Sequence, residues 1–338
     1  MGLIGARPLV CRAKWWYLEM TWIASLTKLS ERELDRLIKR IGAILLVGAL
    51  IFVGFYLFDR WRPATPGIVD RSITSLEAAV RADPEDITAR GRLADAYVLK
   101  ARYAEAITEY EAILSTGKMD EFAHFGRAGA YKAIANLDGA KADYQAVVDI
   151  ASGGEMANVD PMLNASYYGL GAIALEQDQP AEAISQLTHA VAITRSDADA
   201  LNLLGTAYLR NGEPAKAIEP LRSAIAFVPI GWSEPYATLA QAYQDTGDPA
   251  RAAWATAMAD LSAKSYTSAE TGLKAILEGP AALEATIGLG LVNEMRGDGS
   301  AAAEWYTKAL VMEPQNAEAK LGLSRVALPT ATGEGVAP

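Results

Sequence analysis

The most constraining feature of the chain is a set of small and apolar residues that returns with a period of about 34 residues. Leu204, Gly205 and Tyr208 share one face of a predicted helix. A Gly-Glu-Pro break follows and opens a second helix, which carries Ala217 and Leu221 on its apolar face. The spacing predicts a hairpin of two helices whose small residues allow close packing.

Recurrence shows that this pattern is not accidental. Tyr97 and Ala106 return one period later as Tyr131 and Ala140, and the same residue types recur up to Pro314, with one slip of a single residue and two longer interruptions. Such units bury their apolar faces only against their neighbours, so they have to stack. We count six hairpins, which begin near Ile87, Glu121, Asn164, Ala198, Ser233 and Leu283.

The pattern resembles the tetratricopeptide repeat, a helix–turn–helix unit of the same period. The stretch around Gly205 carries the small and large residues of that family at every expected position, and Pro229 closes it. The resemblance implies an all-α, right-handed superhelical solenoid without cofactors. It also implies a non-enzymatic protein whose first helices line a groove for a protein or peptide. The chain departs from the family's carboxylate clamp, since Gly91 and Asp95 replace the Lys and Asn required.

Composition narrows the possible partners. The 338 residues carry a formal net charge of −10, and residues 1–58 hold 8 Lys and Arg against 4 Asp and Glu, so the remainder of the chain carries −14. An acidic surface repels nucleic acid, because affinity there depends on neutralising phosphates. One Cys and two His residues are too few for the usual zinc sites. We therefore expect no nucleic acid, no metal and no small-molecule substrate.

Residues 41–58 contain no charged side chain and predict a transmembrane helix. Eighteen residues span about 27 Å, close to the thickness of the hydrocarbon core of a bilayer. A cleaved signal peptide and a buried core helix are the alternatives. The apolar run is longer than that of a usual signal peptide, and a long segment precedes it. We therefore expect an uncleaved anchor that contacts the lipid bilayer.

Flanking charges predict the orientation of this helix. Five basic residues lie shortly before it, against three shortly after it. Positive charge favours the cytoplasmic side. The sequence thus predicts a single-pass protein of the cytoplasmic (inner) membrane, with a cytoplasmic N-terminus and an extracytoplasmic repeat domain. The segment before Met20 stays open between a membrane-surface segment and an artefact of start-codon choice.

These features divide the chain into five regions. We expect a cytoplasmic segment with a basic amphipathic helix (1–40), the membrane helix (41–58), a linker (59–72), the solenoid with capping helices (73–328) and a disordered tail (329–338). Ser30 and Glu33 have the spacing of a capping box at the start of the first helix.

Two irregularities interrupt the repeats. Residues 151–163 form an insertion, and residues 265–280 predict an extra helix that could pair with residues 250–262.

Carried over residue by residue, the family's groove positions supply the candidate binding residues. Phe122 and Phe125 stand out, because exposed aromatic side chains often dominate interfaces. The alternative is that they pack on the 151–163 insertion. The candidate groove residues are Arg92, Asp95, Phe122, Phe125, Lys132, Tyr168, Glu176, Asn202, Arg210 and Gln241.

These observations favour a membrane-anchored scaffold that assists assembly of an envelope complex. Cytochrome c maturation and secretion are analogies within that class, because a fold does not determine a function. The alternative is an accessory subunit held in a larger membrane complex by its transmembrane helix.

Overall fold

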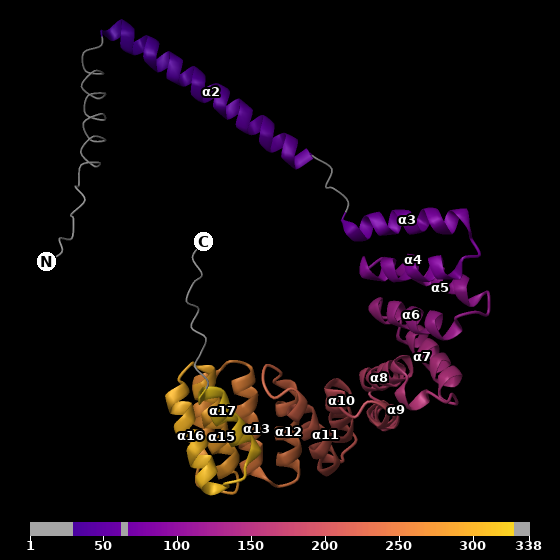
Figure 1. Ribbon diagram of the computed structural model, residues 1–338, viewed down its shortest axis with the longest axis vertical. Coiled ribbons are helices and arrows are strands. Elements are labelled where there is room, and N and C mark those ends of the chain that lie inside the picture. Colours follow the sequence, from indigo (N-terminus) through magenta and orange to yellow (C-terminus); the bar gives the residue numbers. More distant parts are fainter. Residues whose placement is uncertain (1–29, 62–66, 328–338) are drawn as a thin grey trace, which may run out of the picture. The chain divides into compact units, whose positions relative to one another are not determined.

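The computed structural model describes residues 30–61 and 67–327, and it separates into two units at Gly67 (Figure 1). The first described unit is one helix, and the second is the array of repeats. All regular secondary structure in the described residues is helical. The segment 1–29 and the proposed tail lie outside the described part.

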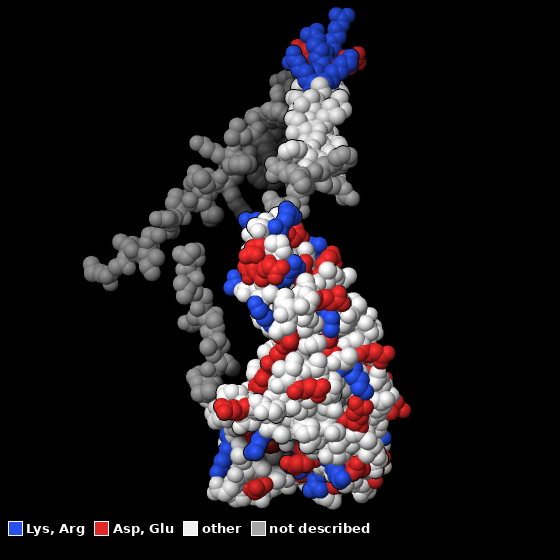
Figure 2. All heavy atoms as spheres, turned by 90° about the vertical axis from the view of Figure 1, so that its right-hand side faces the viewer, with Lys and Arg blue, Asp and Glu red and all other residues white. Residues whose placement is uncertain are grey.

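Helix α2 (Glu31–Trp61) joins the predicted amphipathic and membrane segments into one continuous element of 31 residues. Its start is capped by the Glu33 carboxylate, which accepts hydrogen bonds from the backbone N–H and the hydroxyl of Ser30 at 3.0 and 2.8 Å. Charged side chains gather at this end, and an uncharged stretch follows (Figure 2). The helix is long and apolar enough to cross a membrane, and none of its apolar stretch is buried.

The second unit stacks helical hairpins in succession (Figure 1). All six predicted hairpins are present, each beginning within a few residues of its predicted start. They are α4 (Ile87–Leu99) with α5 (Tyr103–Leu114), α6 (Asp120–Ala133) with α7 (Leu137–Ala151), α8 (Pro161–Glu176) with α9 (Pro180–Ile193), α10 (Ala198–Arg210) with α11 (Pro214–Phe227), α12 (Glu234–Asp245) with α13 (Pro249–Ser262), and α15 (Ala282–Met295) with α16 (Gly299–Met312).

The same turn joins the two helices of every hairpin. One residue adopts a left-handed backbone, as Gly212 does at φ +75°, and the next N–H bonds back to a carbonyl in the last turn of the first helix, as Glu213 does to Tyr208 at 2.9 Å. This is the hydrogen-bond pattern of a Schellman cap. Glycine adopts the conformation at little cost, whereas Ala101 and Ala135 adopt it in the first two hairpins at φ 56° and 60°. Proline then opens several second helices, where its missing N–H has no partner to lose.

Small residues hold the helices of a hairpin close together, as the sequence predicts. A Cβ on Gly205 would lie 2.4 Å from Cγ of Leu221, and a Cβ on Gly171 would lie 2.5 Å from Cγ of Leu187. Both leucines are completely buried. Packing at this density leaves no room for a methyl group.

A second close contact crosses from one repeat to the next. A Cβ on Gly126 would lie 2.4 Å from the ring of Tyr110, and a Cβ on Gly322 would lie 2.4 Å from the ring of Tyr306. Tyr144 meets Gly169 in the same way, at 2.6 Å. The sequence pattern did not predict these contacts.

Capping helices flank the array. α3 (Ile68–Ala82) begins earlier than the predicted 73, directly after Gly67, and packs on α4. Asp70 lies in its first turn, where a negative charge is favourable. At the other end α17 (Ala317–Ala327) packs on α16, as predicted.

The irregularities alter the stack differently. The insertion contains a single 3-10 turn, η1 (Ala157–Val159), and leaves α7 in contact with α8. The extra helix is α14 (Tyr266–Ala275), and α13 packs against both α12 and α14, so the predicted sharing of one helix by two neighbours is confirmed.

This sharing shifts the phase of the stack. Up to α12, each first helix contacts the first helix of the next hairpin: α4 with α6, then α8, α10 and α12. Beyond that point the corresponding contacts run from α13 to α15 and from α15 to α17. The row of helices that contact one another in this way therefore changes from α12 to α13, the second helix of the same hairpin. We call this point the phase shift.

Candidate protein-binding surface

The predicted groove residues lie on the row formed by α4, α6, α8, α10 and α12. On α4, Arg92 and Asp95 are exposed. The Asp95 carboxylate accepts a hydrogen bond from the hydroxyl of Tyr110 at 2.7 Å, so its orientation is fixed by the following helix. Arg92 has no ion pair or hydrogen bond to any described residue and is available to a ligand.

The two phenylalanines of α6 are only partly exposed, because each packs on a tyrosine. Phe122 meets Tyr110 edge to face, with ring centroids 6.0 Å apart, and Phe125 meets Tyr144 at 6.1 Å. Phe125 also belongs to the apolar cluster that contains Ala151 and Leu163, at the two ends of the insertion. The contacts support the packing alternative for Phe125, whereas Phe122 packs toward the first repeat.

The remaining candidates differ in their accessibility. Glu176 is exposed and Lys132 is half-buried. Arg210 is exposed but donates to the carbonyl of Leu175 at 3.1 Å. The amide of Gln241 donates to Asp245 at 2.7 Å.

Asn202 departs from the expectation of a groove position, because its side chain is 2% exposed. Its Oδ1 is buried without a hydrogen-bond partner among the described residues. On α10, Asn202 lies among the buried residues with Leu201 and Gly205. Its side chain therefore points into the stack and not into a groove.

Tyr168 lies in an acidic part of the row. Burial raises the pKa of its phenol, and the negative charges of Asp199, Asp197 and Glu234 raise it further. A neighbouring site shows the same effect on a carboxyl, since burial and Asp160 raise the pKa of Glu121. This part of the row therefore favours positively charged groups.

The histidines serve packing and hydrogen bonding. His124 Nδ1 lies 2.7 Å from Asp143 Oδ1, and Arg127 Nε donates to Asp143 Oδ2 at 2.8 Å. Asp143 is 3% exposed, so the Arg127 guanidinium compensates its buried charge, and His124 adds a hydrogen bond. The ring of His189 stacks on that of Tyr167, with the ring centroids 4.8 Å apart. In the described residues no group of three or more His, Cys, Asp or Glu side chains could hold a metal.

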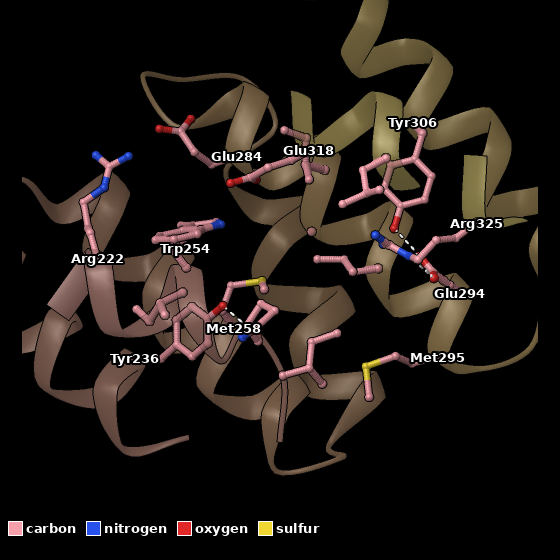
Figure 3. Close-up of a pocket in the computed structure, with 18 residues that line it drawn as sticks. Arg222, Tyr236, Trp254, Met258, Glu284, Glu294, Met295, Tyr306, Glu318 and Arg325 are labelled. Carbon is pink, nitrogen blue, oxygen red and sulfur yellow. Dashed lines mark hydrogen bonds and ion pairs between the residues drawn. The ribbon is translucent and has the colours of Figure 1, made fainter. Parts of the chain in front are cut away.

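The sequence did not reveal a cavity of about 580 Å³ near the phase shift (Figure 3). Its apolar walls include Tyr236, Trp254, Met258, Ile287 and Leu291, from α12, α13 and α15. Residues of α11, α16 and α17, with Pro229 and Ile230 between α11 and α12, complete the lining. The signals that could have indicated it are the one-residue slip and the extra helix, both of which break the regular phase.

One wall of this cavity is a closed polar network. The Glu294 carboxylate accepts hydrogen bonds from Arg325 at 2.7 and 2.9 Å and from the hydroxyl of Tyr306 at 2.6 Å. Burial opposes ionisation of Glu294, but these bonds outweigh it and lower the pKa of the carboxyl. Burial and Glu294 together raise the pKa of the Tyr306 phenol. The network is internally satisfied.

Comparison with known proteins agrees with this architecture. A family model described as tetratricopeptide repeat matches residues 69–123, 161–235 and 237–317. The unmatched stretch between the first two segments, residues 124–160, contains most of the insertion. No curated protein sequence matches the chain.

Several solved structures are similar to it. The MamA protein is 23% identical over 54% of this chain and 95% of its own length, with a TM-score of 0.47. YrrB, described as a tetratricopeptide repeat protein with an unusual peptide-binding site, is 18% identical over 59% and 97%, with a TM-score of 0.49. A tetratricopeptide repeat protein from Parabacteroides merdae is 16% identical over 82% and 98%, with a TM-score of 0.44.

The matched segments cover most of the chain, and their helices pack in consecutive hairpins. The glycine and leucine contacts within the hairpins follow the same pattern. The chain belongs to the tetratricopeptide repeat family.

Proposed function

We propose that this protein is a membrane-anchored scaffold that binds another protein or peptide on the row of first helices and assists assembly of an envelope complex. The fold is that of a protein-interaction scaffold, and members of this family are generally non-enzymatic. To this general role the proposal adds a particular binding surface, the row of first helices, and a membrane anchor, helix α2.

The observation that carries the proposal is the continuous row of first helices with accessible charged side chains. Arg92 and Glu176 are exposed, and Lys132 is half-buried, on α4, α8 and α6. None of the three side chains has an ion pair or hydrogen bond to a described residue. Side chains without internal partners are free to pair with a ligand without first breaking an existing contact.

Helix α2 supports the anchor, because its apolar stretch is fully exposed and long enough for a bilayer. The excess of basic residues on its amino side favours an extracytoplasmic repeat domain. Protease added to spheroplasts should then digest the repeats from about residue 64 onward. Complete protection of the repeats would exclude this orientation.

The experiment for the binding surface is site-specific photo-crosslinking in the full-length protein in native membranes. A photoreactive residue replaces Arg92 or Glu176 in two variants, and Glu304, an exposed residue of a second helix, in a control. We expect the same partner to crosslink at the first two positions and not at the control. Equal labelling at all three positions would contradict the proposed surface.

The alternative remains an accessory subunit held through α2. Deleting residues 1–62 distinguishes the two functions. A soluble repeat domain that still crosslinks to the partner through Arg92 supports the scaffold. Loss of the partner from a folded domain supports the accessory subunit.

A further inference from the structure

The lining of the cavity at the phase shift is charged along one part, and we call this part, which holds Arg222, Glu284 and Glu318, its mouth. Five charged side chains line the cavity. Glu294 forms an ion pair with Arg325, and Glu284 Oε1 lies 3.3 Å from Nε of Arg251, in a second ion pair. Arg222 on α11 and Glu318 on α17 remain without an ion pair or hydrogen bond to any described residue. The mouth therefore offers one free positive and one free negative charge.

The interior of the cavity is apolar and firmly built. Tyr236 is 2% exposed, its hydroxyl donates to the carbonyl of Pro229 at 2.9 Å, and its ring meets Trp254 edge to face at 6.0 Å. Glu318 is close enough to add to the rise in the pKa of the Tyr236 phenol that burial causes. The unpaired carboxylate of Glu318 therefore lies close to the apolar wall that Tyr236 forms. Leu321, which is 60% exposed, adds apolar surface to the lining.

Figure 3 shows how these groups are distributed. Arg222, Glu284 and Glu318 lie toward one edge of the cavity in this view, whereas the satisfied network of Tyr306, Glu294 and Arg325 lies toward the other. The free charges and the apolar walls are therefore presented together.

We propose that this cavity docks a protein segment that inserts one bulky apolar side chain and carries an acidic and a basic residue on either side of it. The acidic residue pairs with Arg222 and the basic residue with Glu318. A cavity of about 580 Å³ lies within the range of sites that enclose a ligand, roughly 300–1,000 Å³. Buried apolar anchors with a polar rim are the usual energetic centre of a protein interface.

The proposal deepens the proposed function and rests on it, since the segment would belong to the protein that the scaffold binds. It also gives the phase shift a role. A regular continuation of the row would follow α12 with the first helix of the next hairpin. Here α13 takes that place, and α15 and α17 complete the walls.

The test uses the full-length protein in nanodiscs and three fluorescein-labelled synthetic peptides. The first has the sequence Gly-Glu-Ala-Trp-Ala-Lys-Gly, the second has Lys at both charged positions, and the third has Glu at both. We expect the wild-type protein to prefer the first peptide in fluorescence anisotropy. The preference should be about threefold to fivefold, as exposed ion pairs typically contribute.

Charge substitutions should change this preference in opposite directions. Arg222→Glu makes the free charges of the mouth doubly negative and should favour the peptide with two Lys residues. Glu318→Lys makes them doubly positive and should favour the peptide with two Glu residues. An unchanged order of the three peptides in both variants would overturn the proposal.

A blocked cavity provides the second measurement. Ala226 lines the cavity and is exposed, so Ala226→Trp should fill space without disturbing the core. Ala215→Trp is the matched control, on an exposed position of the same helix outside the lining. We expect at least tenfold weaker peptide binding only for Ala226→Trp, with circular dichroism unchanged in both. Peptide binding that survives in Ala226→Trp would overturn the proposal.

A third arm separates protein segments from small molecules. Free 5-fluorotryptophan, followed by fluorine NMR, should bind at least tenfold more weakly than the first peptide. Equal affinity would identify a small-molecule site and overturn the docking of a protein segment. Failure of the proposed scaffold is recognised separately, because the crosslinks at Arg92 and Glu176 do not involve this cavity.

Discussion

At one position of the second helix, the first, second and last hairpins carry tyrosine, whereas the third and fourth carry leucine. Tyr110, Tyr144 and Tyr306 are almost completely buried, as are Leu187 and Leu221. The leucines press on a glycine of their own hairpin. The tyrosine rings reach further, into the next repeat, where Gly126, Gly169 and Gly322 make room for them.

In the third hairpin, the position that corresponds to Gly126 in the next repeat holds a large residue. Leu203 follows Leu187 at the same interval along the chain as Gly126 follows Tyr110. Leu203 packs on the cluster that contains Leu187. A tyrosine is therefore matched by a glycine in the next repeat, and in the third hairpin the smaller Leu187 is matched by the larger Leu203. The repeats are not interchangeable modules, because part of each core is completed by the neighbour.

The largest expected effect comes from removing the ring of Tyr306, which packs both on its own hairpin and on the capping helix α17. Tyr306 is fully buried between Gly290 and Gly322, and its hydroxyl bonds to Glu294. Tyr306→Ala should lower the free energy of unfolding of the last repeat by about 3–5 kcal/mol. Urea denaturation with hydrogen exchange of α16 and α17 measures this. The exposed neighbour Thr307→Ala is the control. A loss below about 1 kcal/mol would show that the ring does not hold the last repeat together.

Overpacking a leucine hairpin should have the next largest effect. Gly205→Leu forces Leu221 away and should cost about 1–3 kcal/mol. The matched control is Gly129→Leu, a helical glycine with no atom within 4 Å of the added Cβ. That change should be neutral or stabilise by up to about 1 kcal/mol, because glycine is a poor helix former. Equal melting temperatures of the two variants would mean that Gly205 does not set the hairpin spacing.

Contacts within a hairpin could be predicted from the sequence, because they follow a fixed spacing. The glycine at 205 and the leucine at 221 belong to a pattern that recurs, and the helical period places them face to face. The extra helix was predictable because residues 265–280 read as a helix outside the recurring pattern. The tyrosine–glycine contacts were not, since the sequence does not show which side chain crosses a repeat boundary.

The candidate surface was harder to predict than the fold. A family position indicates a helix face, but it does not tell how far a side chain is covered. Asn202 lies at such a position and is buried, and Phe122 and Phe125 pack on tyrosines. The cavity was missed because its lining is brought together from six helices and the segment between α11 and α12, and these are far apart in the sequence.

A double substitution should sharpen the comparison of tyrosine and leucine repeats. Tyr110→Leu leaves a void beside Gly126, and Gly126→Leu alone clashes with the ring, so each should destabilise the first two repeats. Together they reproduce the arrangement of Leu187 and Leu203. The double variant should be more stable than the sum of the single effects predicts, by about 0.5–3 kcal/mol. Additive effects in urea denaturation would mean that the two positions are independent.

The smallest expected effect is a dependence on pH in the last repeat. The Glu294 carboxyl has a lowered pKa, because bonds from Arg325 and Tyr306 outweigh the effect of burial. The folded state therefore binds its proton less readily than the unfolded chain, whose glutamate pKa is about 4.3. Its stabilising contribution is present above that value and is lost as the pH falls through the lower folded pKa.

This contribution can be isolated by comparing two variants of one repeat. Glu294→Gln should flatten the fall in unfolding free energy of the last repeat between about pH 5 and pH 3. Glu304→Gln changes an exposed glutamate of α16 that has no ion pair among the described residues, and should leave the slope as in the wild type. Because Glu294 is partly accessible to solvent, we expect a modest difference that salt reduces. Identical slopes for the two variants would show that the acid sensitivity of this repeat arises elsewhere.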